Sequence, residues 1–264
     1  MNRVYLEGVG IVGPGLAGWT ASRPVLGGSE AYRPAPAVVA ASNLLPAAER
    51  RRTPMTVKLA LAAGEEAFKN ASRDAAATAT VFVSSSSDGD TLHQMCEALN
   101  TAEREVSPTR FHNSVHNAAA GYWSIATRCR EPSTSLGCYD TSFAAGLLEA
   151  AVQVGTGAPI GLIAYDQPYP EPLHSARPIH ASFGVALVMA PQAGAHAFAR
   201  LEIEFVPDPG QATRMADAAL DAVRLGNPAA RALPLLAALA RKDGGVVVLD
   251  FLSGAQLRVA ATPC

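Results

Sequence analysis

The sequence predicts an α/β protein with a layered core, and three observations lead to this prediction. Short apolar runs rich in Val, Ile and Leu alternate along the chain with longer segments rich in Ala and Leu. Apolar residues make up 49% of the 264 residues and charged residues 17%, which is typical of a globular protein with a substantial core. No low-complexity tract or linker divides the chain, so we expect a single domain over residues 1–264.

The first half of the chain is expected to alternate strands and helices. The segment 3–12 is predicted to be a buried strand, and 13–52 a long connection with little regular structure. Thr53 suits the N-cap, and Pro54 the first position, of a helix that continues to about Asn70. The elements predicted after it are a strand over 79–85, a helix that follows the Ser-rich turn, a mostly helical segment over 109–129, a strand over 133–138 and a helix over 141–156.

The second half continues the same alternation. The predicted elements are a strand over 159–166, a Pro-rich loop over 167–181, two strands over 183–190 and 198–206, two helices near 212–224 and 228–241, and a closing hairpin or adjacent strand pair over 244–251 and 255–261.

Charge and cysteine content exclude several classes of protein. The net charge of -2 gives no overall bias toward nucleic acid or anionic membranes. The one dense basic cluster, 50–52, fits either a solvated helix entry or a docking site for an acidic partner. No apolar run approaches the ~20 residues of a membrane span, and the N-terminus lacks the core of a signal peptide, so we expect a cytoplasmic protein. The cysteines are widely spaced without CxxC, so neither a disulfide framework nor a zinc site is predicted.

No motif predicts a nucleotide or metal cofactor. The stretch "VFVSSSSDGDT" lacks the GxxxxGK[ST] pattern, so a Ser-rich turn that caps the next helix is expected, and "GVGIVGPG" lacks GxGxxG spacing. His112 and His116 would share a helical face but belong to no HExxH pattern, so they are expected to line an interface or channel. A triad of Ser142, His116 and Asp140 has no GxSxG elbow to support it.

Cys138 is the candidate nucleophile that the residues themselves suggest. It lies shortly before a predicted helix, where the helix N-terminus can lower the pKa of a thiol and make it reactive. Free cysteine is also among the residue types most often buried in ordinary cores. Spacing alone leaves both interpretations open.

Five consecutive segments resemble the N-terminal half of the β-ketoacyl synthases: "RVYLEGVGIVGPG", "RRTPMTVKLALAAGEEAF", "TVFVSSSSDGDTLHQMCEAL", "SPTRFHNSVHNAAAGYWSIA" and "PSTSLGCYDTSFAAGLLEAA". The resemblance covers 1–205, with 108–157 the most specific part, and leaves 206–264 as a reduced C-terminal half. The sequence is most similar to the short ketosynthase-like subunits called chain-length factors, particularly those of aryl polyene pathways. This resemblance implies a thiolase-like layered α/β/α fold with a truncated C-terminal half.

The register of the resemblance places Asp140 where the family carries its nucleophile. Asn117, Ala120 and Gly121 match the family's Asn-x-x-Ala-Gly stretch. The catalytic Cys usually follows eight positions after a Pro that is matched here by Pro132, and that position is Asp140. A carboxylate is a poor acyl acceptor, and near a helix N-terminus its expected role is capping or hydrogen bonding.

A second difference from the family also points to missing catalytic residues. The chain has no HGTGT-like motif and no His after His196, whereas condensing enzymes carry two catalytic histidines in their C-terminal half. The resemblance therefore implies a subunit without catalytic residues or cofactor, with Cys138 as the alternative nucleophile.

The resemblance also implies a heterodimer with a catalytic ketosynthase, and through it an indirect link to acyl carrier protein in polyketide or fatty acid-like biosynthesis. Three alternatives stay open: a weak acyltransferase, a malonyl-carrier decarboxylase, and a self-associating structural or binding protein. The residues expected at the tunnel or interface are Phe111, His112, Val115, His116, Asn117, Ala118, Ala119, Ala120 and Trp123. A plain amphipathic helix packed into its own core is the competing interpretation of this segment.

Overall fold

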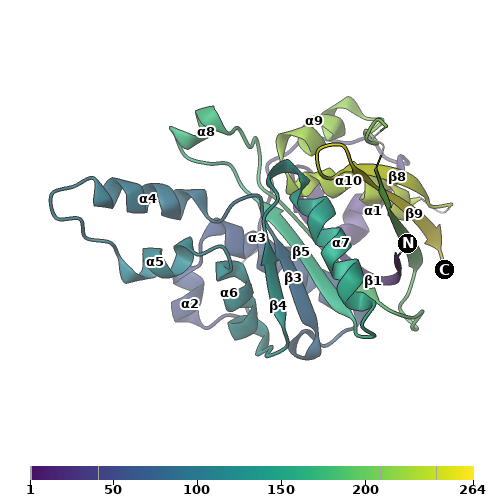
Figure 1. The fold of residues 1–264 in the computed structure, drawn as a ribbon, viewed down its shortest axis with the longest axis horizontal. Helices are drawn as coiled ribbons and strands as arrows, with labels where there is room; N and C mark the ends of the chain where they lie inside the picture. The colour runs from purple at the N-terminus through teal and green to yellow at the C-terminus, as the bar shows by residue number, and fades with distance from the viewer. Residues whose placement is uncertain (1, 41, 208–209, 242) are drawn as a thin grey trace.

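The protein is built around one mixed β-sheet with helices on both faces (Figure 1). A computed structural model describes residues 2–40, 42–207, 210–241 and 243–264. The strands follow the order β4-β3-β5-β6-β1-β7-β9-β8, with β2 paired to β1 outside this path. Their bounds are β1 Asn2–Gly13, β2 Leu16–Ala17, β3 Ala79–Val83, β4 Ser133–Leu136, β5 Ile160–Asp166, β6 Phe183–Ala190, β7 Ala199–Val206, β8 Gly245–Asp250 and β9 Gln256–Pro263.

The parallel part of the sheet fixes where a site can form. Strand β3 pairs in parallel with both β4 and β5, whereas the neighbouring pairs from β5 to β8 are antiparallel. The carboxyl ends of three strands therefore meet at the same edge of the sheet. In open α/β sheets this is the edge at which ligands usually bind.

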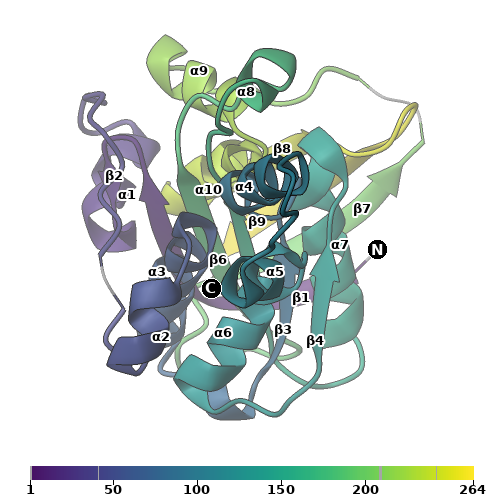
Figure 2. The same ribbon diagram turned by 90° about the vertical axis from the view of Figure 1, so that its left-hand side faces the viewer.

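Helices cover both faces of the sheet. Helix α3 packs on β1, β5 and β6, whereas α7 packs on β3 and β5 from the other side, as Figure 2 shows. The helices are α1 Trp19–Gly27, α2 Ala47–Arg52, α3 Met55–Ala71, α4 Gly89–Leu99, α5 Pro108–Ser114, α6 Ala118–Thr127, α7 Ser142–Val154, α8 Leu173–Ala176, α9 Ala218–Gly226 and α10 Leu233–Ala240.

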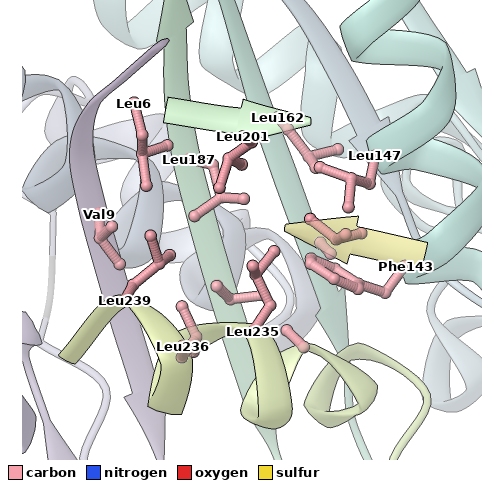
Figure 3. Close-up of a cluster of buried hydrophobic side chains, with 14 of the residues drawn as sticks. Leu6, Val9, Phe143, Leu147, Leu162, Leu187, Leu201, Leu235, Leu236 and Leu239 are labelled. Carbon is pink, nitrogen blue, oxygen red and sulfur yellow. The ribbon is translucent and has the colours of Figure 1, made fainter. Parts of the chain in front are cut away.

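Each face has its own hydrophobic cluster. The cluster under α7 and α10 joins side chains of β1, β5, β6, β7 and both helices, and Figure 3 shows Leu147 of α7 beside Leu162 of β5. The cluster under α3 and α6 includes Trp123. Because side chains alternate across a strand, β1 contributes to both clusters.

The close approach of α3 to β1 depends on glycine. A Cβ atom at Gly8 would overlap the carbonyl oxygen of Ala67, and one at Gly10 would overlap that of Ala63. Only residues without a side chain allow the helix to lie this close to the strand.

Two local expectations are wrong, and a third is confirmed with one addition. The connection 13–52 contains β2, α1 and α2. Helix α1 holds Pro24 inside it, and its N-cap, Gly18, makes no side-chain hydrogen bond. Thr53 ends α2 and donates to the Glu49 carbonyl rather than capping α3. The segment 109–129 is mostly helical, as expected, and it forms two helices because Val115 is extended between α5 and α6.

Helices α4 and α5 project from the body as an arm, which we define as residues 89–117 (Figure 1). The Ser-rich turn caps the start of the arm as expected, through Asp88, whose carboxylate accepts the Thr91 N–H at 2.8 Å. Within the described residues, no helix combines the length and apolarity that a membrane crossing requires.

The turn between β3 and the arm is tied to β5 by a buried acid. Oδ1 of Asp166 accepts hydrogen bonds from the Ser84 hydroxyl at 3.0 Å and from the Ser85 hydroxyl and amide at 2.8 Å each. Its other oxygen, Oδ2, is buried and has no partner in the part of the chain that the structure describes. Burial raises the pKa of Asp166 to about 7, against the lowering effect of the serine hydrogen bonds.

Replacing Gly10 by Ala should lower the free energy of unfolding by about 1–3 kcal/mol, because the new methyl group forces α3 away from β1. Gly121→Ala is the matched control, since a Cβ there meets no atom within 4 Å, and it should be neutral or slightly stabilising. Chemical denaturation of both variants measures the difference. Equal stability of the two variants would contradict the packing argument.

Asp166 should make the protein less stable as the pH rises from about 4 to about 7. In that range the folded protein holds a proton that the unfolded chain has released, so the free energy of unfolding falls with pH. Asp166→Asn should flatten this fall, which denaturation at pH 5 and pH 8 can measure.

Glu103→Gln, a change at an exposed carboxylate, is the control and should leave the pH dependence as it is. If the Asp166→Asn variant kept the wild-type pH dependence of stability, a group other than Asp166 would have to cause it.

Candidate functional site

The segment between β4 and α7 forms a tight elbow, which we define as residues 137–142. Tyr139 takes a φ of 54°, in the left-handed region that costs a non-glycine residue about 1–2 kcal/mol. Side chains of the elbow hold this conformation. The Ser142 hydroxyl accepts the Cys138 N–H at 2.9 Å and donates to the Tyr139 carbonyl at 2.7 Å, and the Thr141 hydroxyl donates to the Cys138 carbonyl at 2.8 Å.

Asp140 is engaged in an ion pair at the centre of the elbow. Nη2 of Arg177 donates to Oδ1 of Asp140 at 2.8 Å, and the guanidinium lies 3.4 Å from the centre of the Tyr139 ring. Burial lowers the pKa of Arg177, but the hydrogen bond and charge of Asp140 outweigh it and raise that pKa overall. Asp140 therefore holds a cation over the elbow instead of capping α7, whose N-cap is Thr141.

Cys138 is half-buried beside this pair. Its backbone N–H and carbonyl take part in the hydrogen bonds that hold the elbow. The guanidinium that contacts the elbow is paired with Asp140 rather than with the Cys138 sulfur. Arg177 therefore already has a carboxylate partner, and no hydrogen bond or ion pair joins it to Cys138 among the described residues.

The histidines of the arm do not converge on the elbow as a catalytic group. Nε2 of His116 lies 3.2 Å from the Ser84 carbonyl, whereas the His112 ring packs edge-on against Tyr122 with centroids 5.8 Å apart. The triad of Ser142, His116 and Asp140 is not formed, because each member has a different partner. Among the described residues, no group of His, Cys, Asp or Glu is arranged to hold a metal ion.

His116 nevertheless lies directly behind the elbow. A Cβ atom at Gly137 would be 3.0 Å from His116 Nε2 and 3.1 Å from the Ser84 carbonyl. The end of the arm, the turn after β3 and the elbow after β4 are therefore in contact at the carboxyl edge of the sheet.

The tunnel or interface residues expected from the sequence separate into two groups. Phe111 is 63% exposed and Val115 is 43% exposed, and His112 and Asn117 are also exposed, whereas His116 and Ala118 are half-buried. Ala119, Ala120 and Trp123 are buried in this chain's own core, which leaves them little surface to offer a partner.

The arm carries more exposed apolar surface than those residues alone. Leu92 and Leu99 of α4 are also about half exposed, and Ile125 extends the apolar surface along α6. Strand β4 lies at the end of the sheet next to this surface and pairs with β3 alone among the described strands. An unpaired strand edge beside exposed apolar side chains is a surface that another chain can cover.

Sequence reasoning missed Arg177 and Asp166. Arg177 lies in an irregular Pro-rich loop 37 residues after Asp140, and nothing in the sequence joins the two positions. Asp166 carried a usable signal, since it is an acid at the end of a strand that is otherwise wholly apolar.

Comparison with solved structures shows a shared fold. A chain of the complex "Ketosynthase (ApeO) in Complex with its Chain Length Factor (ApeC) from Xenorhabdus doucetiae" superposes with a TM-score of 0.71 at 20% identity, covering 98% of this chain and 99% of that one. A chain of "The ishigamide ketosynthase/chain length factor" gives 0.69 at 15% identity over 100% and 99% of the two chains.

A third structure, a type II polyketide acyl-carrier protein in complex with its ketosynthase, has a chain that matches with a TM-score of 0.74 at 12% identity, covering 100% of this chain and 99% of that one. A search of curated protein sequences finds no match. The thiolase-like fold expected from the sequence is confirmed by these ketosynthase structures. The profile described as "Beta-ketoacyl synthase, N-terminal domain" matches residues 26–243, and the chain therefore belongs to that family.

Proposed function

We propose that this protein is a chain-length factor, a non-catalytic ketosynthase-like subunit that pairs with a catalytic β-ketoacyl synthase and helps to shape its acyl tunnel. It would act in the biosynthesis of a polyketide or aryl polyene, on chains attached to an acyl carrier protein in the cytoplasm. The observation that carries this proposal is the Asp140–Arg177 ion pair in the elbow.

The chemistry of condensation supports a non-catalytic role. A ketosynthase needs a thiolate to accept an acyl group from its carrier, and the register of the family places Asp140 at that position. A carboxylate attacks thioesters poorly, and this one already accepts a hydrogen bond from a guanidinium. The elbow thus has the shape of a nucleophile turn, with its central charge used to bind Arg177.

The surface beside the elbow supports pairing with another chain. The exposed edge of β4 can extend the sheet across an interface, and the apolar side chains of the arm can be buried against a partner. Two of the most similar solved structures are named as complexes or pairs of a ketosynthase and a chain length factor. In such a pair, Phe111 and Val115 would reach the partner from the exposed face of α5 and the break that follows it.

Cys138→Ala should leave product formation by the co-purified pair nearly unchanged, because we assign the acyl-accepting thiol to the partner. The measurement is acyl loading of each subunit from acyl carrier protein, followed by intact-protein mass spectrometry, with and without the partner. The control is replacement of the partner's own nucleophile, which should abolish product.

Three results would argue for the alternatives. Stable acylation of Cys138 in the isolated chain would indicate an acyltransferase. Loss of carbon dioxide from malonyl-carrier protein with the chain alone would indicate a decarboxylase. A stable homo-oligomer that does not bind the ketosynthase would indicate a self-associating protein.

Phe111→Ala should shift the products of the pair to longer chains, because the smaller side chain enlarges the end of the proposed tunnel. Val115→Phe should shift them to shorter chains, because the larger side chain narrows it. Chromatography and mass spectrometry of the products give the chain-length distribution. Leu225→Ala, at an exposed leucine of α9, is the matched control and should leave the distribution unchanged. Unchanged products from both arm variants would remove these residues from the tunnel.

A further inference from the structure

The loop between β5 and β6, residues 167–182, reaches the elbow through Arg177, and we call it the strap. Figure 1 shows its short helix α8 projecting from the body, and α8 makes no extensive contact with another helix or strand of the described chain. A segment with so little packing has low local stability. The position of the strap therefore depends on a small number of side-chain contacts.

One of these contacts joins the strap to the elbow. Arg177 donates to Oδ1 of Asp140 at 2.8 Å, and its guanidinium lies 3.4 Å from the centre of the Tyr139 ring. The Arg177 side chain is only 19% exposed in this position, whereas the Asp140 side chain is 42% exposed and Tyr139 is 61% exposed. Withdrawal of Arg177 would therefore open both elbow residues further to solvent.

Two histidines flank Arg177 within the strap. His174 and His180 lie three residues before and after it, and their rings pack edge-to-face with centroids 6.3 Å apart. His180 is fixed to the body, because its N–H donates to the Gly226 carbonyl at 2.9 Å. The ring of His180 also needs the missing side chain of Gly226, where a Cβ would lie 2.8 Å from Cδ2. The contact between the two rings thus attaches the tip of the strap to a fixed point.

This arrangement suits neutral histidines. Nδ1 of His174 is buried and has no partner among the residues that the structure describes. A neutral ring can leave one nitrogen as an acceptor, whereas a protonated ring has a donor on both nitrogens, and a buried donor without an acceptor is costly. Two charged rings at this distance would also repel each other. The one histidine–carboxylate ion pair of the described residues joins His93 to Glu97 in the arm, so no carboxylate pairs with the strap histidines.

The other charged groups around the strap are already engaged. Glu171 accepts hydrogen bonds from the hydroxyl and the amide of Ser175 at 2.8 Å and 3.2 Å. In α9, which lies beside the His180 ring, Arg224 donates to Asp221 at 2.6 Å. Asp166 is the group that must be controlled, because the guanidinium that binds the elbow lowers its pKa against the larger effect of burial.

We propose that the strap is an acid-sensitive closure of the elbow, in which the His174–His180 pair controls whether Arg177 stays bound. Histidine gains a charge as the pH falls from about 8 to about 5. The neutral pair holds the strap closed, and the protonated pair separates and withdraws Arg177 from the elbow. The open strap then holds more protons than the closed strap, so acid favours opening. This device does not rest on the proposed function, because it needs neither a partner nor an acyl group.

Double electron–electron resonance on the full-length chain measures the position of the strap directly. One spin label is attached at Ala176→Cys in the strap and the other at the native Cys264, which is exposed. Cys96→Ser and Cys138→Ala remove the competing thiols, and Cys129 is buried and stays unlabelled. We expect one narrow distance distribution at pH 8 and a second, displaced population at pH 5.5, with an open-to-closed ratio about tenfold larger.

Four variants in this labelled background assign the response. His174→Phe keeps an aromatic ring without the charge and should hold the distribution narrow at pH 5.5. His180→Gln removes the second charge, so its distribution should no longer change with pH. Arg177→Met should show the open population at both pH values, because the contact with the elbow is lost. His196→Gln, at an exposed histidine outside the strap, is the matched control and should respond to acid as the unmodified sequence does.

Thermal melting shows whether each variant is folded, and if His174→Phe fails to fold, His180→Gln still decides the outcome. A single narrow distribution at both pH values in the unmodified sequence would overturn the proposal. An acid response that survives both histidine changes would overturn it too. Asp166→Asn should keep the response, and its loss there would assign the opening to Asp166 instead of the histidine pair.

Discussion

The buried carboxylate of Asp166 is the contact on which the arrangement at the carboxyl edge depends. Its Oδ1 holds the turn after β3, from which the arm departs, against the end of β5. The backbone carbonyl of Asp166 accepts a hydrogen bond from the Asn227 side-chain amide, which joins the loop after α9 to the end of β5. Because Ser84 in that turn contacts His116 behind the elbow, a shift of Asp166 would move the arm, the elbow and the C-terminal helices together.

The elbow keeps a strained backbone because several contacts hold it in place. Tyr139 is held in the left-handed region by hydrogen bonds from both sides and by a guanidinium stacked on its ring. Backbone strain of this kind persists when the surroundings over-determine it. Here the surroundings include the start of α7, whose apolar face forms a large part of the core, so relaxing the elbow would displace buried side chains.

The sequence predicts correctly those strands and helices in which no residue argues against the assignment. The strands β1, β5 and β6 are wholly or mostly buried, so their apolar runs were sufficient to locate them. Helix α1 was missed because Pro24 and an uncapped start argue against a helix, yet packing on α10 stabilises it. The break at Val115 was missed because a β-branched residue is no strong helix breaker, and only the arm's return to the body requires it.

The candidate site was less predictable than the fold, since its main contact joins distant parts of the chain. The position of Asp140 came from a family resemblance, but its partner Arg177 belongs to a loop without periodicity, which no pattern could connect to the elbow. For Trp123, in contrast, the helix that carries it indicates where the side chain lies. Its place in the core follows from its helix, but the orientation of its ring depends on Gly64 and Phe68, which contact the ring from another helix.

The two faces of the sheet therefore impose different constraints on the same strands. On the α7 face the side chains of β1 are large and pack into a continuous core, so a substitution there disturbs the elbow through α7. On the α3 face β1 presents Gly8 and Gly10, which allow α3 to lie close to the strand. Because α3 lies this close to the sheet, its Gly64 and Phe68 also reach the ring of Trp123 and help to bury it.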